Sequence, residues 1–363
     1  MLKEKLDSAF AFLQTKAPPL IGVDISSSAL KLVELSEIGK SSYRLERYTI
    51  EPLAKDLVTD GNIVNLDQVS DALRRAHKRL GSRNKHIAMA LPTAMVITKK
   101  IIVPAGQTED ELELQVEAEA NQYIPFALDE VNLDFQILGQ APNNPEDVEV
   151  LIAASRKEKV EDRVAIADNA GLRPAVMDVE SYATEEAYRM IAPSLPAGGR
   201  DQNVALVDIG AHVMHFYVIR NNQILFSRDQ AFGGNQLTHD IQRAFNLSPE
   251  EAESAKKNAG LPENYDADVL QPFMETLALE VTRALQFFFT STSYSQVDQV
   301  VLAGGCSLLS GLDELVAKRA GVNTIVGNPF ANMAVSDRIR PRQLAADVPL
   351  LLIACGLALR GFE

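Results

Sequence analysis

The chain contains few residues that could cross-link it or hold a metal through sulfur. It has two cysteines in 363 residues, Cys306 and Cys355, and no tryptophan. Two cysteines cannot build a disulfide framework or a cysteine-rich metal site, so we expect a protein of a reducing compartment. The motifs G-x-x-x-x-G-K-[ST], H-E-x-x-H and G-x-S-x-G are missing, which argues against a P-loop nucleotidase, a zinc peptidase of that type and an α/β-hydrolase.

The sequence also lacks an apolar run long enough to cross a bilayer. The longest such run covers residues 348–359 and is interrupted by Gly356, whereas a spanning helix needs about 20 apolar residues. A buried helix is the better interpretation. Charges at positions 3, 4, 5 and 7 leave no room for the apolar core of a secretory signal. We therefore expect a soluble, cytoplasmic protein.

Acidic residues outnumber basic ones, 49 against 35, for a formal net charge of −14. Such a surface disfavours non-specific binding to nucleic acid and broad adhesion to anionic lipid. Residues 66–80 predict an amphipathic helix whose polar face carries Arg74, Arg75, Lys78 and Arg79. These side chains form either a nucleic-acid patch or a solvated helix face. Because no aromatic residues are interleaved with them, the solvated face is favoured and no nucleic-acid partner is expected.

The first residues form a short amphipathic stripe. Leu2, Leu6, Phe10 and Leu13 recur at helical spacing before the pair Pro18-Pro19. A stripe of this kind suits a partner, a membrane surface or the body of the chain itself. Three lysines against two acidic residues before Pro18 disfavour the membrane surface.

Two segments about half the chain apart share one design. Residues 20–25 and 204–209 are apolar strands that deliver Asp24 and Asp208 to turns of small residues, and each is followed by a returning strand. This internal duplication predicts an α/β protein of two similar halves, a bilobed fold of the duplicated ribonuclease-H-like kind. The second returning strand ends at Asn221-Asn222, a two-residue hairpin turn.

Between the halves lies a segment that resembles a small α+β module. Thr108 and Glu111 are spaced as a capping box that opens a helix ending near Pro125, with predicted strands before and after it. We place a linker at residues 193–199, which are rich in proline and glycine. The predicted division is a first lobe of residues 1–84, 171–195 and 335–363, an inserted module of residues 85–170, and a second lobe of residues 200–334 with a helical subdomain at about 241–290.

The paired turns have the chemistry of a polyphosphate site. Carboxylates do not bind phosphate directly, so Asp24 and Asp208 make sense if Mg²⁺ lies between them and the phosphates, reached through water. Ser26, Ser27 and Ser28 add hydroxyl donors to the first turn. The alternative is that both segments are ordinary β-turns.

Two glycine pairs strengthen the nucleotide hypothesis. Gly233-Gly234 precedes a predicted helix and should present free N–H groups to a phosphate. Gly304-Gly305 follows a buried strand and lets a flat base or ribose approach the backbone. Glu253 and Lys256 share a helix face at i, i+3 and suit a ribose and an adenine edge, although a surface ion pair is the simpler interpretation.

These elements, in this order over residues 20–359, resemble the actin-like ATPases. The inserted module is similar to that of the cell-division protein FtsA. Four further segments look closest to the PilM family of type IV pilus assembly proteins: residues 122–126, 129–135, 285–289 and 354–359.

The resemblance implies a scaffold for pilus biogenesis and twitching motility, with ATP or ADP and Mg²⁺ bound between the lobes. It implies a partner in the short cytoplasmic N-terminal tail of the membrane protein PilN, contact with other pilus components, and a location at the inner face of the inner membrane. The residues it assigns to the nucleotide are Asp24, Ser26, Ser27, Ser28, Asp208, Gly210, Ala211, Gly233, Gly234, Glu253, Lys256, Gly304, Gly305 and Ser307. The tail groove is expected around an exposed strand edge at Met95, Ile97, Ile101 and Val103, with Tyr123 and Phe126 nearby.

One departure from the family pattern bears on catalysis. Active relatives place threonines after Gly210, whereas this chain has Ala211-His212-Val213-Met214 and no hydroxyl. Glu180 stands where the superfamily has a water-activating acid, or is a structural carboxylate. We therefore expect nucleotide binding with slow or negligible hydrolysis. Two other functions fit the same fold: a membrane-associated filament protein of the FtsA type and a small-molecule kinase.

Overall fold

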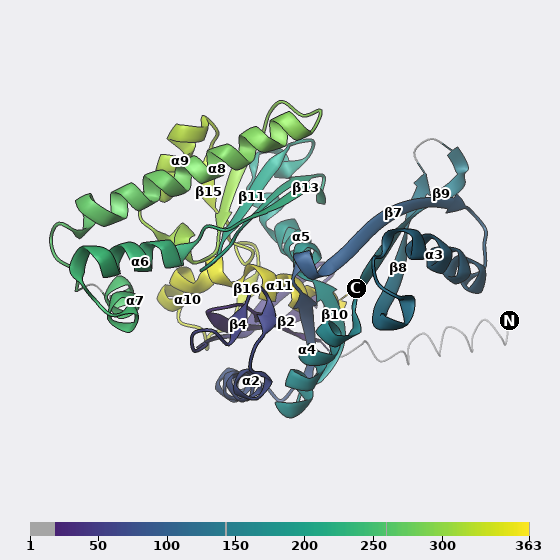
Figure 1. Cartoon of the computed structure of the whole chain (residues 1–363), viewed down its shortest axis with the longest axis horizontal. Coiled ribbons are helices and arrows are strands. Elements are labelled where there is room, and N and C mark those ends of the chain that lie inside the picture. The colour runs from purple at the N-terminus through teal and green to yellow at the C-terminus, as the bar shows by residue number, and fades with distance from the viewer. Residues whose placement is uncertain (1–18, 142–143, 259, 363) are drawn as a thin grey trace.

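The computed structural model describes residues 19–141, 144–258 and 260–362, and it shows two lobes with a smaller module set to one side (Figure 1). The stripe predicted at residues 2–13 lies outside the described residues.

The first lobe is built on a six-stranded sheet in the order β10-β6-β1-β2-β3-β16. Strand β1 pairs antiparallel with β2 and parallel with β6, which is in turn parallel to β10. A short hairpin, β4 (Val58–Thr59) and β5 (Asn62–Ile63), precedes helix α2. The sheet strands are β1 (Ile21–Ile25), β2 (Ala29–Gly39), β3 (Ser42–Pro52), β6 (His86–Leu91), β10 (Arg173–Val179) and β16 (Ala334–Val335).

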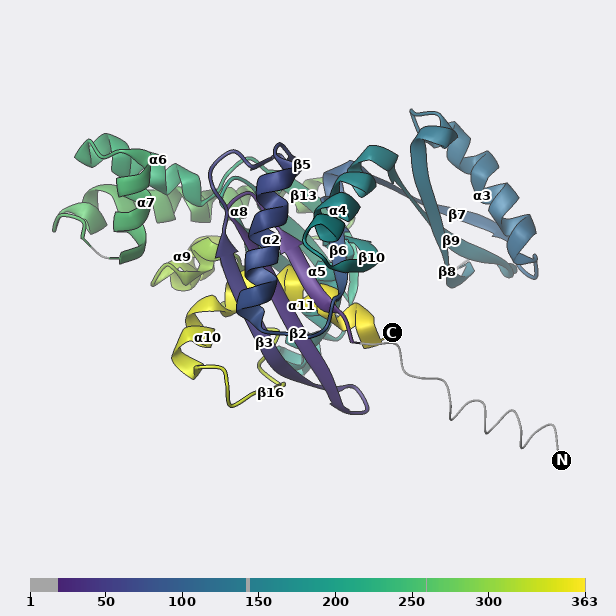
Figure 2. The same ribbon diagram turned by 90° about the horizontal axis from the view of Figure 1, so that it is seen from below.

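Helices cover both faces of this sheet. On one face, α2 (Leu66–Leu80) and α4 (Lys157–Asn169) pack on β1 and β6 through buried residues such as Leu73 and Ile166. On the other face lie α5 (Glu180–Ile191) and α11 (Leu352–Leu359), with α10 (Pro341–Asp347) ahead of α11. Figure 2 shows α2 on the side turned to the viewer, with α11 beyond the sheet.

The second lobe repeats the core of the first. Its sheet has the order β13-β12-β11-β14-β15, in which β11 is antiparallel to β12 and parallel to β14. The positions of β11, β12 and β14 match those of β1, β2 and β6, so the predicted duplication is confirmed. Its strands are β11 (Val204–Ile209), β12 (Met214–Arg220), β13 (Gln223–Gln230), β14 (Gln299–Ala303) and β15 (Thr324–Val326); its helices are α6 (Gly234–Phe245), α7 (Pro249–Asn258), α8 (Gln271–Ser291) and α9 (Leu312–Ala320).

The apolar run near the C-terminus is a core element. By length and composition alone, residues Pro341–Phe362 could cross a membrane, but 61% of their most apolar stretch is buried inside the protein. Helix α11 packs between β1 and α5, and Cys355 is fully buried there. The predicted buried helix is confirmed.

The inserted module is smaller than the sequence predicts. It comprises β7 (Val96–Pro104), α3 (Glu109–Tyr123), β8 (Val131–Ala141) and β9 (Asn144–Arg156), in a sheet of order β7-β9-β8. The predicted capping box is present at Thr108 and Glu111. The boundaries 85–170 were wrong, because β6 is a central strand of the first lobe and α4 packs on α2. Local pattern could not assign them, since a central strand and a docked helix look the same in either unit.

Candidate functional site

Asp24 and Asp208 end equivalent strands of the two lobes, and each lies opposite a basic residue. Asp24 on β1 is paired in register with Lys31 on β2, and Asp208 on β11 with His215 on β12. Lys31 Nζ lies 2.8 Å from Asp24 Oδ2 and donates to Ser26 Oγ at 2.8 Å. Asp24 is only 4% exposed. Each hairpin therefore holds an acid and a cation side by side.

The charges of the two hairpins act on each other, so the ends of β1 and β11 lie near one another. Burial raises the pKa of Asp208, and the negative charge of Asp24 adds to that rise. The cations of His215 and Lys31 act in the opposite direction on the same pKa. The two carboxylates therefore disfavour each other's charged form, and the neighbouring cations offset part of this effect.

The first turn is closed by its own hydrogen bonds. Ser26 donates to the carbonyl of Ala29 from both its backbone N–H, at 3.1 Å, and its hydroxyl, at 2.9 Å. Ser27 is half-buried and Ser28 is exposed. The hydroxyl of Ser26 therefore holds the turn together, and Ser27 and Ser28 lie at its surface.

The second turn is locked to the start of α6. The backbone N–H of Gly234 donates to Gly210 at 3.0 Å, and that of Asn235 donates to Ala211 at 2.9 Å. The prediction of a free N–H was wrong for Gly234, because the carbonyl of Gly210 accepts it. A Cβ at Gly233 would lie 2.5 Å from the oxygen of Ala211, so this glycine serves the close approach of the two segments.

The two glycines after β14 differ in their surroundings: Gly304 is closely packed and Gly305 faces open space. Gly304 has φ +79°, and a Cβ there would lie 2.4 Å from Asp208 Oδ1. At Gly305, by contrast, a Cβ would meet nothing within 4 Å. Ser307 is 4% exposed and donates its hydroxyl to the carbonyl of Gly304 at 2.8 Å. Gly305 is thus the member of this segment that faces open space beside the aspartates.

Glu253 and Lys256 form a polar cluster with Thr238, from α6. Thr238 Oγ1 donates to Glu253 Oε2 at 2.9 Å and accepts from Lys256 Nζ at 2.7 Å. Burial raises the pKa of the Cys306 thiol to about 11, with Lys256 opposing the rise and the charges of Asp208 and Glu253 adding to it. The charges of the α7 pair therefore act on Cys306, the residue that follows the glycine turn.

Glu180 begins α5 and faces the same cluster of charges. Burial, with a contribution from Asp24, raises its pKa to about 7. Burial acts to lower the pKa of His215, but its hydrogen bond to Asp229, 2.7 Å from Nδ1 to Oδ1, and the nearby carboxylates raise it to about 9. At neutral pH His215 is a cation that balances carboxylates and cannot act as a base.

Lys31, His215 and Asp229 were not identified as site residues by the sequence analysis. The signal that finds the first two is strand register. In each hairpin the residue opposite the aspartate is basic, and a cation buried beside a carboxylate at the end of a strand is a candidate phosphate ligand.

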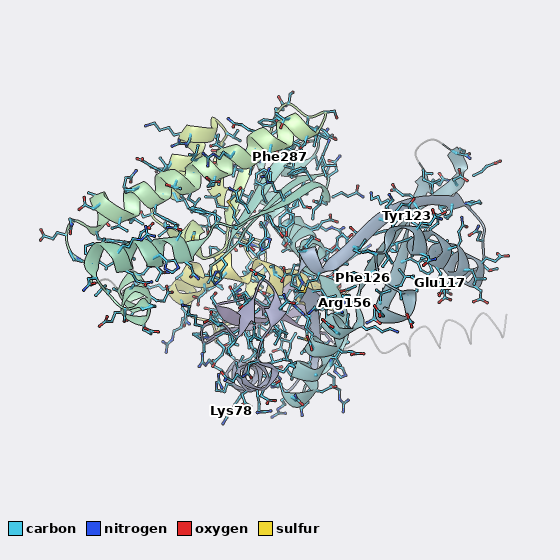
Figure 3. All side chains as sticks on the ribbon, in the orientation of Figure 1. Lys78, Glu117, Tyr123, Phe126, Arg156 and Phe287 are labelled. Carbon is cyan, nitrogen blue, oxygen red and sulfur yellow. The ribbon has the colours of Figure 1, made fainter. Side chains whose placement is uncertain are left out.

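The residues expected to line a partner groove divide into two groups. Tyr123 and Phe126 are 46% and 38% exposed, and Lys99 and Arg156 lie over their rings (Figure 3). Met95 and Ile97 are half-buried where β7 leaves the first lobe.

The side chains of Ile101 and Val103 do not face outward, so they can take part in a partner groove only through the backbone of the strand edge. They are 8% and 1% exposed and belong to the module's core with Leu112 and Val116 of α3. The outward residues of this part of β7 are Lys100 and Ile102. Strand β7 itself is an edge of its sheet, so its backbone stays available to a further strand.

The two lobes contain similar sheets, in which β11, β12 and β14 match β1, β2 and β6. This duplicated arrangement is that of the actin-like fold class. The ethanolamine utilization protein EutJ from Carboxydothermus hydrogenoformans has this fold, with a TM-score of 0.56 and 19% identity over 95% of this chain and 91% of that one. An archaeal actin homolog, Ta0583 in complex with ADP, matches at a TM-score of 0.51 and 12% identity over 95% of this chain and 99% of its own.

Within that class the family is defined by the sequence. The family model for type IV pilus assembly protein PilM matches residues 22–362, so the chain belongs to the PilM family. A chain of a PilM-PilN type IV pilus biogenesis complex is 32% identical, with a TM-score of 0.79 over 96% of this chain and 99% of that one.

More distant relatives are cell division proteins FtsA. The Bacillus subtilis (strain 168) protein is 26% identical over 66% of this chain and 52% of its own length. The Helicobacter pylori (strain 26695) protein is 24% identical over 71% of this chain and 50% of its own. The chain thus spans about half the length of the curated relatives it matches.

Proposed function

We propose that the chain is a nucleotide-binding scaffold of type IV pilus assembly that holds the cytoplasmic N-terminal tail of PilN at the inner face of the inner membrane. The observation that carries the proposal is the full-length match to a chain of a PilM-PilN complex, at 32% identity. Contact with other pilus components and a role in twitching motility are part of the same proposal.

The charged and open positions near the ends of β1 and β11 suit a nucleotide. Lys31, already hydrogen-bonded at the first turn, supplies a cation for phosphate oxygens. The carboxylates Asp24 and Asp208 would hold Mg²⁺ through its water ligands, and Mg²⁺ would neutralise the phosphates. Gly305 leaves open space for the nucleoside, with Glu253 of the α7 cluster beside it.

Slow hydrolysis follows from what surrounds the second turn. Residues 211–214 carry no hydroxyl to orient a water. His215, whose pKa is raised to about 9, is protonated at neutral pH and cannot take a proton from an attacking water there. Glu180, whose pKa burial raises to about 7, would then be the base, but with no hydroxyl beside it to orient that water. We expect turnover below about 1 per second, under the usual range of dedicated enzymes.

Gly305 gives a test of the nucleotide site. Saturating Mg·ATP, at 100 times its Kd, should stabilise the protein by about 2.7 kcal/mol. Gly305→Phe should fold normally, because the added side chain enters open space, yet it should lose this shift because the ring occupies the nucleoside position. The measurement is thermal unfolding with and without Mg·ATP, after release of any co-purified nucleotide.

Gly305→Ala is the matched control and should keep most of the stabilisation, since a methyl group fills little of the space. If the phenylalanine variant is stabilised as strongly as the parent, the nucleotide binds elsewhere.

The tail site is tested on the inserted module. Tyr123→Ala combined with Phe126→Ala should weaken binding of a synthetic PilN tail peptide at least tenfold, since exposed aromatics are typical anchors of peptide interfaces. Fluorescence anisotropy of the labelled peptide measures the loss. Leu114→Ala, at an α3 residue that is 69% exposed, should leave affinity unchanged. Equal affinity of all three proteins would place the tail elsewhere.

A further inference from the structure

One short segment of the chain is rich in basic residues. Residues 74–85 contain six Lys and Arg side chains and no Asp or Glu, in a protein whose net charge is −14. The segment runs along the last part of α2, ends that helix at Gly81, whose φ is +68°, and continues to β6. The net charge used to argue against anionic surfaces therefore hides a strong local excess of positive charge.

Half of these cations are free of ion pairs within the part of the chain that the structure describes. Arg75 and Arg79 pair with Glu51, and Arg74 pairs with Asp71. Lys78, Arg83 and Lys85 have no such partner and are exposed. Figure 3 shows Lys78 on the outer side of the first lobe, and Figure 2 shows that α2 lies open along this side.

A depression at the end of α2 gathers further arginines. Its volume is about 520 Å³, and its lining includes Arg47 from β3, Arg83 from the α2–β6 connection and Arg338 from the segment after β16. The acid of this depression, Glu34, is already paired with Arg47 at 3.4 Å and accepts from Ser82 at 2.7 Å. Arg83 and Arg338 are therefore left to meet an anion from outside.

Pro19, the first residue that the structure describes, lies at the rim of this depression. Asn84, which lines it, donates a hydrogen bond to the carbonyl of Pro19. The 18 residues before Pro19 contain the apolar stripe of Leu2, Leu6, Phe10 and Leu13. An amphipathic segment and a polybasic patch together are the two signals that attach a protein to an anionic bilayer.

We propose that the surface formed by residues 74–85 with Arg47 and Arg338, the basic surface, binds the anionic phospholipids of a membrane directly. Nucleic acid fits it less well, because residues 74–85 contain no aromatic side chain on which bases could stack. The apolar positions in the sequence at residues 2–13 favour a lipid surface over an acidic protein. This contact would orient the scaffold on the membrane independently of its protein partner.

The test uses the full chain and vesicles. Phosphatidylcholine vesicles, with or without an equal part of phosphatidylglycerol, are sedimented with the protein at low and high salt. We expect binding to the anionic vesicles at low salt only. Lys78→Gln, Arg83→Gln and Lys85→Gln together should weaken it about 100-fold, because one basic residue near an anionic surface contributes about fivefold.

The matched control removes the same charge from the second lobe. Arg243, Lys318 and Arg319 are exposed, and their triple change to glutamine should leave vesicle binding near that of the parent. Both triple variants should still bind the PilN tail peptide, so a failure here is distinguishable from failure of the proposed function.

Three results would overturn the proposal. One is an equal loss in the two triple variants. Another is loss on deletion of residues 1–18 with no effect of the triple change at 78, 83 and 85. The last is binding of polyglutamate or DNA, but not of anionic vesicles, through the same three side chains.

Discussion

Replacing Gly356 with valine should prevent the first lobe from folding. A Cβ at this position in α11 would lie 1.7 Å from the carbonyl oxygen of Ala183 in α5, well inside any van der Waals contact. The helix cannot relieve the clash by moving away, because on its other side Gly22 of β1 approaches it equally closely. A Cβ at Gly22 would lie 2.0 Å from the oxygen of Ala354.

The expected cost is large because backbone meets backbone. Overpacked cores usually lose about 1–3 kcal/mol by shifting side chains, whereas here two main chains must separate. We expect at least about 4 kcal/mol, a large part of the 5–15 kcal/mol that stabilises a typical domain. Soluble yield and circular dichroism on heating measure the effect.

Gly260→Val is the control for this substitution. Gly260 is exposed, and a Cβ there would meet nothing within 4 Å, so its effect should stay within about 0.5 kcal/mol. A Gly356→Val protein that melts with the parent would show that α11 does not cross α5 as described.

The fold could be predicted from the sequence because its repeated units are local. An apolar strand, an aspartate, a turn and a returning strand occur twice, and the PilM family match covers residues 22–362. What could not be predicted is whether a strand or helix belongs to the first lobe or to the inserted module when its own sequence pattern suits both. Strand β6 lies between β1 and β10 in the first sheet. This position depends on pairing with strands that are distant in the sequence, so the residues of 86–91 do not by themselves predict it.

In the candidate site too, features that follow from the sequence repeat could be predicted, whereas tertiary contacts could not. Asp24 and Asp208 lie at equivalent strand ends as predicted, since their positions follow from the repeat. The N–H groups of Gly234 and Asn235 are taken by carbonyls of the second turn, a tertiary contact that a glycine pair does not reveal. Lys31 was missed because a lysine seven residues after an aspartate has meaning only once the register of β1 and β2 is known.

Replacing Lys31 with methionine should have two separable effects. Lys31 and Asp24 are 11% and 4% exposed as side chains, and their ion pair at 2.8 Å is buried. Removal of one partner leaves a buried charge uncompensated, which typically costs 3–5 kcal/mol. The free energy of unfolding of the nucleotide-free protein should fall by about that amount. The stabilisation by Mg·ATP should also disappear, because the phosphates lose their cation.

A double variant separates these effects. Asp24→Asn combined with Lys31→Met removes both charges, so most of the lost stability should return. Nucleotide binding should not return, since neither the cation nor the carboxylate is restored. If the double variant regains the Mg·ATP shift together with its stability, the pair is structural and the phosphates bind elsewhere. Recovery of stability alone would show that the pair takes part in nucleotide binding, Lys31 as a phosphate ligand and Asp24 through Mg²⁺, and is not only structural.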